Sequence, residues 1–221
     1  EGEKYYNLST LEKDAHAILT TQTPNYIYKF PNGKTTSQLN EIMVKENAFL
    51  EYYIDEVIPY EDAIYYQKTF ADIKKGGSLI LTDGLTAGWS ESDTPFLYNK
   101  VDLKTKILYD DELVFNDYLI VNPREEDMSE LGLFEGYTNF NSVVIIDENF
   151  CTDWIKRSKE ALDTKEFEGI YGITALEKYG FVLRILGRSS HNNLGIMWDF
   201  INFYREEIRS LKHLELRKNQ R

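Results

Sequence analysis

Apolar and polar residues alternate along the first two thirds of the chain in short runs that favour β-strands. These runs are rich in β-branched and aromatic residues, recur about every ten residues, and show no helical periodicity between them. Turn residues such as Gly33 and the Gly76-Gly77 pair separate them. The predicted strands are 17–21, 25–30, 35–44, 49–56, 63–73, 79–85, 96–108, 113–121 and 142–146. The pattern predicts a mainly β body over residues 1–147.

Three segments of this body echo one another: 11–22, 44–55 and 73–84, offset by 33 and then 29 residues. Each begins with an aliphatic residue, passes a charged pair, turns, and enters a β-prone stretch that ends on polar residues. Self-similarity at such a period is typical of stacked repeats, because one unit cannot bury its apolar face alone. We therefore expect a stacked, solenoid-like sheet body in which the polar ends fall into register. The predicted rows are Thr21, Ile54 and Asp83, then Gln22, Asp55 and Gly84.

The last third of the chain, residues 148–221, changes to a mixed pattern. The predicted elements are a helix at 149–162, strands at 169–177 and 180–186, and a second helix from about 192 to 214. Asp147 is the predicted N-cap of the first helix and Ser190 a candidate cap of the second. Because no linker rich in Pro, Gly or Ser is present, we expect one domain over 1–221, with the β body followed by a helix–strand–strand–helix end.

Charge and cysteine content narrow the possible partners and location. The formal net charge is −12, and an acidic surface repels nucleic acids and anionic membranes, so we expect neither as a partner. Cys151 is the sole cysteine, which fits a reducing, cytoplasmic location. No apolar run approaches the ~18–20 residues that cross a bilayer, and no signal peptide is visible. Because the chain begins at Glu1 in strand-like sequence, we expect that an N-terminal segment is missing.

The sequence offers little support for catalysis. It contains no Gly-x-Ser-x-Gly elbow, no Walker A loop and no Gly-x-Gly-x-x-Gly motif. The three histidines are far apart, and no two have the close spacing of a ligand pair. A hydrolase using paired carboxylates stays open as an alternative, but many pairs could be drawn from 37 acidic residues. We therefore expect that the protein is not an enzyme.

Two acidic residues and a group of aromatic residues remain as candidates. Asp83 and Asp117 each stand beside strongly apolar strand residues, and oxygen ligands on separate strands can pass a borderline cation weakly. The alternative interpretation is a polar rim where stacked repeats meet solvent. Aromatic residues next to turns mostly belong to the core, but a minority anchor a protein partner. The candidates for partner binding are Tyr53, Tyr60, Phe134 and Tyr137.

Several strings resemble the UreD (also called UreH) family of urease accessory proteins, in collinear order from residue 1 to about 212. They are LTTQTP at 19–24, ENAFLEY at 46–52, IPYEDA at 58–63, LTD at 81–83, FEGY at 134–137 and GFVLRILGR at 180–188. The resemblance implies a non-catalytic maturation factor that acts as a scaffold for nickel insertion into urease apoprotein. It also implies a UreF-type partner, a UreG-type GTPase recruited through it, transient nickel, and no tightly bound cofactor.

The resemblance further implies an internal nickel channel with acidic positions at Glu3, Asp83 and Asp117, and with Thr20 and Thr21 beside them. This sequence departs from the family pattern at three places. Glu3 stands where Asp is common, Asp117 where Glu is common, and Trp89 where an Arg is usual. The carboxylate changes preserve charge but alter reach by one methylene. The alternative function is a β-solenoid protein-binding scaffold with no metal path.

Overall fold

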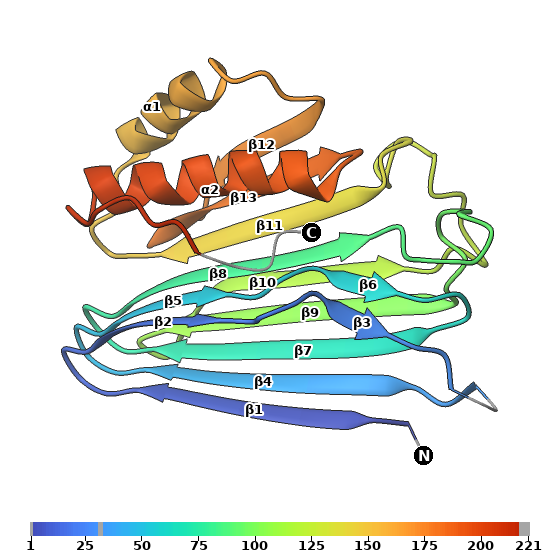
Figure 1. Cartoon of the computed structure of the whole chain (residues 1–221). Coiled ribbons are helices and arrows are strands. Elements are labelled where there is room, and N and C mark those ends of the chain that lie inside the picture. Colours follow the sequence, from blue (N-terminus) through green and yellow to red (C-terminus); the bar gives the residue numbers. More distant parts are fainter. Residues whose placement is uncertain (1, 31–32, 217–221) are drawn as a thin grey trace.

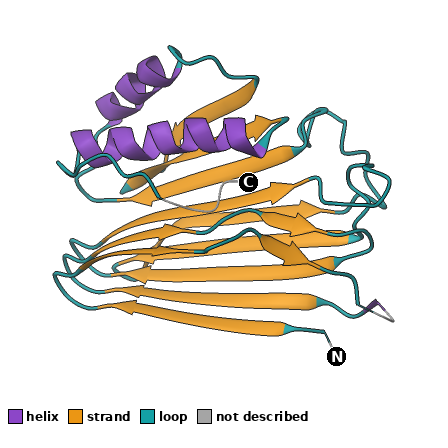
Figure 2. Cartoon of the chain, in the orientation of Figure 1, coloured by secondary structure: helices purple, strands orange, loops and turns teal. Residues whose placement is uncertain are grey.

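The computed structural model describes residues 2–30 and 33–216, and Figure 1 shows two stacked β-sheets with two helices beside them. The chain is mainly β, as predicted, and Figure 2 shows how few of its segments are helical. The elements are β1 (Lys4–Leu11), β2 (His16–Thr20), β3 (Asn25–Ile27), β4 (Thr36–Val44), β5 (Phe49–Tyr53), β6 (Val57–Pro59), β7 (Ile64–Ile73), β8 (Ser78–Thr86), β9 (Lys100–Tyr109), β10 (Glu112–Val121), β11 (Asn139–Ile146), α1 (Thr152–Leu162), β12 (Gly169–Ala175), β13 (Gly180–Gly187) and α2 (Ser190–Glu207).

The chain alternates between the two sheets. Sheet A has the order β1-β4-β7-β9-β10, with β1, β4, β7 and β9 parallel and β10 antiparallel to β9. Sheet B has the order β12-β13-β11-β8-β5-β2, in which β2, β5 and β8 are parallel and the other strands antiparallel. The short strand β3 pairs with β6, and β6 with β8. Because β1, β4 and β7 lead into β2, β5 and β8, successive coils stack as in a solenoid.

Pairing of the coils confirms the predicted repeat. Leu11 pairs with Val44 and Val44 with Ile73 in sheet A, which are the offsets of 33 and 29 residues expected from the sequence. In sheet B, Thr20 pairs with Tyr53 through the same first offset. In-register stacking carries residues such as Leu11, Val44 and Ile73 onto one another, so apolar positions of successive coils join into a shared core.

The corners between the sheets stack as well. Asp14, Asn47 and Gly76 all have positive φ, at 59°, 57° and 73°. Asn, Asp and Gly tolerate this left-handed conformation better than other residues. Asn47 Nδ2 donates a hydrogen bond of 3.0 Å to Asp14 Oδ1, which links adjacent corners. The expectation that each of the three repeats turns before its β-prone stretch is therefore confirmed.

Both helices cover the outer face of sheet B (Figure 1). The core there centres on Trp154, whose ring centroid lies 4.5 Å from that of Phe181 and 5.2 Å from that of Phe200. Trp154 belongs to α1, Phe200 to α2 and Phe181 to strand β13 of sheet B. One aromatic cluster therefore holds both helices to the sheet.

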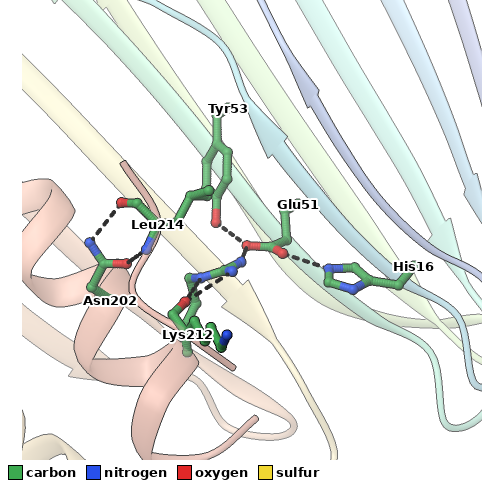
Figure 3. A network of polar contacts seen from close by, with 7 residues as sticks. His16, Glu51, Tyr53, Asn202, Lys212 and Leu214 are labelled. Carbon is green, nitrogen blue, oxygen red and sulfur yellow. Dashed lines mark hydrogen bonds and ion pairs between the residues drawn. The ribbon is translucent and has the colours of Figure 1, made fainter. Parts of the chain in front are cut away.

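A buried ion pair ties α2 to the parallel half of sheet B. Arg205 Nη1 donates to Glu51 Oε2, and neither side chain is more than 7% exposed. Tyr53 also donates to Glu51 Oε2, and His16 Nε2 lies 2.6 Å from Glu51 Oε1 (Figure 3). Burial, followed by the Glu51 charge, raises the pKa of Tyr53, so its hydroxyl stays protonated.

The boundaries of the two helices correct the sequence expectations. The N-cap of α1 is Cys151, not Asp147, whose Oδ1 instead accepts from the backbone N–H of Asn149. The N-cap of α2 is Ser189 rather than Ser190.

Helix α2 ends at Glu207, short of the predicted 214. Beyond it, Ser210 has a positive φ of 51°, and Asn202 binds the backbone of Leu214 through both its amide oxygen and its amide nitrogen (Figure 3). These contacts stabilise a non-helical course for the segment that follows the helix.

Two strand predictions also need correction. The predicted strand 49–56 ends at Tyr53 as β5, and the short strand β6 that follows it lies beyond the predicted range. The stretch from Lys4 to Leu11 forms the outer strand β1 of sheet A, which was not among the predicted ranges.

Replacement of Gly76 by Ala should destabilise the stacked corners. An added Cβ would lie 2.2 Å from Asn47 Oδ1, and the positive φ costs about 1–2 kcal/mol for a residue with a Cβ. Gly195→Ala is the control, because an added Cβ meets nothing within 4 Å in α2 and should stabilise the helix by about 1 kcal/mol. Urea unfolding of both variants measures the effect, and a wild-type midpoint for Gly76→Ala would contradict it.

Replacement of Arg205 by Met should cost about 3–5 kcal/mol of unfolding free energy, because it leaves the Glu51 carboxylate buried without its cation. Arg157→Met is the matched control. Its partner Glu207 is 40% exposed, and an exposed pair contributes only about 0–1 kcal/mol. Chemical denaturation measures the unfolding free energy of both variants. Equal losses of unfolding free energy would contradict the prediction that the buried Glu51 pair matters more than the exposed one.

Candidate functional site

Five strands that face the space between the sheets share one pattern of inward residues, in which a polar residue stands between apolar ones. In β8, for example, Asp83 lies between Leu81 and Leu85. The flanking apolar residues belong to two separate core clusters, one toward each end of the strands. A polar belt therefore crosses an otherwise apolar interior. The five polar residues are Asp83 in β8, Thr105 in β9, Asp117 in β10, Ser142 in β11 and Arg184 in β13.

Strand register joins these residues into two rows. In sheet A, consecutive partners are Asn7, Asn40, Thr69, Thr105 and Asp117. Residues directly opposite one another on neighbouring strands place their side chains on the same face, so this row is polar across the whole width of the sheet.

The row in sheet B is formed by Asp83, Ser142, Arg184 and Gly172, which are consecutive partners on β8, β11, β13 and β12. Asp83 and Ser142 face the same cavity as Thr105 and Asp117 of sheet A. The two rows therefore meet inside the sandwich, and residues far apart in the sequence form one site.

Hydrogen bonds connect the belt from the β1 side toward Asp83. Asn7 Nδ2 and Gln38 Nε2 each donate to Asn40 Oδ1 at 2.9 Å. Tyr65 donates to Gln67 Oε1 at 3.0 Å, and Gln67 Nε2 donates to Asp83 Oδ2 at 3.1 Å. Buried polar groups are costly unless they are bonded in this way.

Asp83 is held in an environment that favours its neutral form. Its Oδ1 accepts from the backbone N–H of Gly84 at 2.9 Å and its Oδ2 from Gln67. Burial raises the pKa of Asp83 to about 7, against the opposing effect of these two hydrogen bonds and with a further contribution from the Asp117 charge. The carboxyl group therefore changes its charge near neutral pH.

Asp83 and Asp117 line one cavity of about 20 Å³, together with Thr105 and Ser142. That space suffices for about one water-sized group. Ser142 is 5% exposed, and its hydroxyl has no hydrogen-bond partner among the described residues. An orphaned buried hydroxyl beside two carboxylates points to a polar occupant of the cavity.

Asp117 also faces a larger and mainly apolar groove of about 430 Å³. The groove lies between β10 and β12, which are the outer strands of the two sheets. Arg184 lines the same groove, and its Nη2 donates to Asp117 Oδ1 at 2.7 Å. Asp117 thus stands between the internal cavity and the surface.

The other predicted channel residues lie away from this cavity. Glu3 is exposed and accepts a hydrogen bond of 2.5 Å from Tyr5, which pairs in register with Gln38 of the belt. Thr20 donates to the backbone oxygen of Tyr53, so it caps the strand pairing and does not line the cavity.

Thr21 forms a separate pair with the next coil. Its hydroxyl donates to Asp55 Oδ2 and accepts from the backbone N–H of Asp55, both at 2.9 Å. Tyr52 pairs with Leu81, which is the register that the predicted row of Thr21 and Asp83 requires. The pairing of the strands ends before Thr21 and Ile54, so the row itself stays a prediction, and of its members only Asp83 lines the cavity.

The aromatic partner-binding candidates divide into buried and accessible residues. Tyr53 is 1% exposed and Phe134 is 4% exposed, so both are core residues and the expectation that they form surface anchors is corrected. Tyr137 is partly exposed and lies beneath the Arg188 guanidinium. Tyr60 lies in a surface cluster, and its ring contacts those of Tyr26, Tyr28 and Trp89.

Sequence reasoning missed Thr105, Ser142 and Arg184. Their signal is a single polar residue among inward apolar ones, as in Val182, Arg184 and Leu186 of β13. Such a residue is hard to assign to a face before the strand boundaries are known, because a shift of one position exchanges the two faces.

Within 2–30 and 33–216, no three His, Cys, Asp or Glu side chains gather in a group that could hold a metal ion. Over the same part of the chain, neither helix combines the length and apolar character needed to cross a membrane.

A sequence profile described as "UreD urease accessory protein" matches residues 1–220. The chain is similar to proteins named urease accessory protein UreD. That of Streptococcus salivarius is 42% identical over 219 residues, covering 99% of this chain and 78% of the relative. That of Bacillus cereus is 33% identical, covering 93% and 75%, and that of Ureaplasma parvum is 32% identical, covering 98% and 76%. A match of this extent establishes the family: the chain belongs to the UreD urease accessory proteins.

Proposed function

We propose that this protein supports urease maturation by letting nickel pass through the polar belt between its sheets, without a catalytic step of its own. The observation that carries the proposal is the cavity shared by Asp83, Asp117 and the orphaned Ser142 hydroxyl. Family membership supplies the context of urease, and the belt supplies a physical route for a divalent cation.

The chemistry of the belt suits transit better than storage. A cation that moves through a protein needs oxygen ligands along its way, each weak enough to release it. The cavity offers two carboxylates and two hydroxyls, and the pKa of Asp83 near 7 lets a proton compete with the cation there. Binding at Asp83 is therefore coupled to proton release, which weakens retention at neutral pH.

The ends of the route follow from the two outer strands of sheet A. On the β1 side, Asn7 connects through Asn40 and Gln38 to Tyr65 in the interior. Glu3 lies on the same side and accepts a hydrogen bond from Tyr5, whose register partner is Gln38. On the β10 side, Asp117 reaches the apolar groove. We expect nickel to enter at one of these edges and leave at the other.

The same proposal includes cytoplasmic partners: a UreF-type protein, a UreG-type GTPase bound through it, and urease apoprotein. The exposed aromatic cluster around Tyr60 offers a docking surface, with Tyr28 58% exposed and Trp89 48% exposed. Aromatic side chains are enriched at the energetic centres of protein interfaces. The alternative, a scaffold with no metal path, uses this surface but not the belt.

Asp83→Asn and Asp117→Asn should each lower urease activation in cells by about tenfold or more while leaving partner binding intact. Each change removes a charge from the cavity and keeps the side-chain volume, so cation transit weakens without loss of the core. Urease activity and urease-bound nickel are measured after co-expression with the cognate urease and accessory proteins, and partner binding by co-purification.

Asp110→Asn is the matched control, because Asp110 is exposed at the β9–β10 turn and its φ of 49° is equally accessible to Asn. Full activation by both belt variants, with partners still bound, would reject the metal path and favour the plain scaffold.

The thermal stability of Asp83→Asn should rise relative to the wild type as pH increases from about 4 to about 7 and then level off. The folded pKa of Asp83 is raised to about 7 from an unfolded value near 4, so its ionisation costs stability as pH rises through this window. Asn carries no such cost. Melting temperatures of both proteins across this range test the prediction, with Asp110→Asn as control. A constant difference at every pH would contradict the raised pKa.

A further inference from the structure

The ion pair between Arg184 and Asp117 closes the end of the polar belt. Arg184 stands in β13 of sheet B and Asp117 in β10 of sheet A, so the bond of 2.7 Å joins the two sheets at the open edge of the sandwich. Asp117 faces both the internal cavity and the outer groove. Arg184 therefore binds the Asp117 carboxylate, which lines both the internal cavity and the outer groove.

The strand rows explain how Arg184 reaches this position. Its partner on β11 is Ser142 and its partner on β12 is Gly172. An added Cβ on Gly172 would meet nothing within 4 Å, so the space beside Arg184 on the β12 side is open. The Arg184 side chain is 51% exposed, and it lines a groove of about 430 Å³. The guanidinium can therefore leave Asp117 without displacing any core residue.

A guanidinium at this place excludes other cations. Arg stays protonated at every physiological pH, so its charge repels a divalent ion that approaches the Asp117 carboxylate. It also occupies one of the oxygens that such an ion would bind. A partly exposed ion pair contributes little to stability, which leaves the fold only weakly dependent on it.

We propose that Arg184 is the gate of the cation path and that an arriving divalent cation must displace its guanidinium from Asp117. This inference rests on the proposed transit of nickel through the belt. Arg184 acts through Asp117 as a positioning and selectivity residue, and it binds no metal itself. The gate keeps weakly binding cations out of the cavity because they cannot outcompete the guanidinium.

The test is calorimetric titration of the purified chain with Ni²⁺ for the wild type, Arg184→Gln, Arg184→Lys and Asp83→Asn. Removal of an opposite charge within about 4–6 Å changes a carboxylate's affinity for a cation by tenfold or more, so Arg184→Gln should bind Ni²⁺ about tenfold more tightly. Arg184→Lys retains the charge and should bind near the wild-type level.

Two controls separate the gate from the surface and from the fold. Arg124→Gln removes an arginine whose pair with Asp62 is exposed and lies outside the belt, so its Ni²⁺ affinity should match the wild type. The double variant Arg184→Gln/Asp83→Asn should lose the gain, which assigns the binding to the cavity. Melting temperatures of all variants report folding separately from binding.

The outcomes distinguish the two proposals. If Arg184→Gln binds Ni²⁺ as the wild type does while Asp83→Asn binds more weakly, the gate is wrong and the path stands. If Asp83→Asn leaves Ni²⁺ binding unchanged in both backgrounds, the path is wrong and the gate falls with it. Tighter binding by Arg184→Gln that depends on Asp83 supports both.

Discussion

In-register stacking of the coils is the constraint on which the rest of this structure depends. Positions that lie 33 and then 29 residues apart pair directly, as Leu11, Val44 and Ile73 do. A polar residue at one position therefore becomes part of a polar row, and an apolar residue part of a core. The left-handed corner residues Asp14 and Asn47 hold this register by linking one turn to the next.

Burial of the polar belt lowers the stability of the fold, and this loss distinguishes the belt from the apolar core around it. Most of its side chains are satisfied by one another, which limits the penalty of burying them. Part of that penalty remains, because burial raises the pKa of Asp83 and the Ser142 hydroxyl has no hydrogen-bond partner among the described residues. A sandwich with apolar residues at these positions would be easier to stabilise. The proposed cation path would give this cost a function, and the proposed gate at Arg184 would stand at its end.

Sequence predictions that depend on residues close together in the chain were mostly correct, whereas several that depend on contacts between distant residues were wrong. Most strands, the repeat, the turns and the C-terminal strand pair depend on local pattern, and the structure confirms them, although β1 was missed and some strand ends were wrong. The end of α2 was wrong because Asn202 binds a segment that folds back on it, a contact that no periodicity reveals. Tyr53 and Phe134 resemble exposed anchors beside turns, yet both are buried, Tyr53 beneath Trp198 of α2 and Phe134 against Phe96 of a neighbouring loop.

By itself the sequence determined most of the strands, how far apart the partners in successive coils lie, and that Asp83 and Asp117 are unusual carboxylates in apolar strands. Only the tertiary structure decided that these two carboxylates share a cavity and that Ser142 and Arg184 complete their surroundings. Asp117 and Arg184 lie 67 residues apart and belong to different sheets. Pairing within a sheet follows the register that repeats encode, whereas contact between sheets depends on how two complete faces pack, which no single segment specifies.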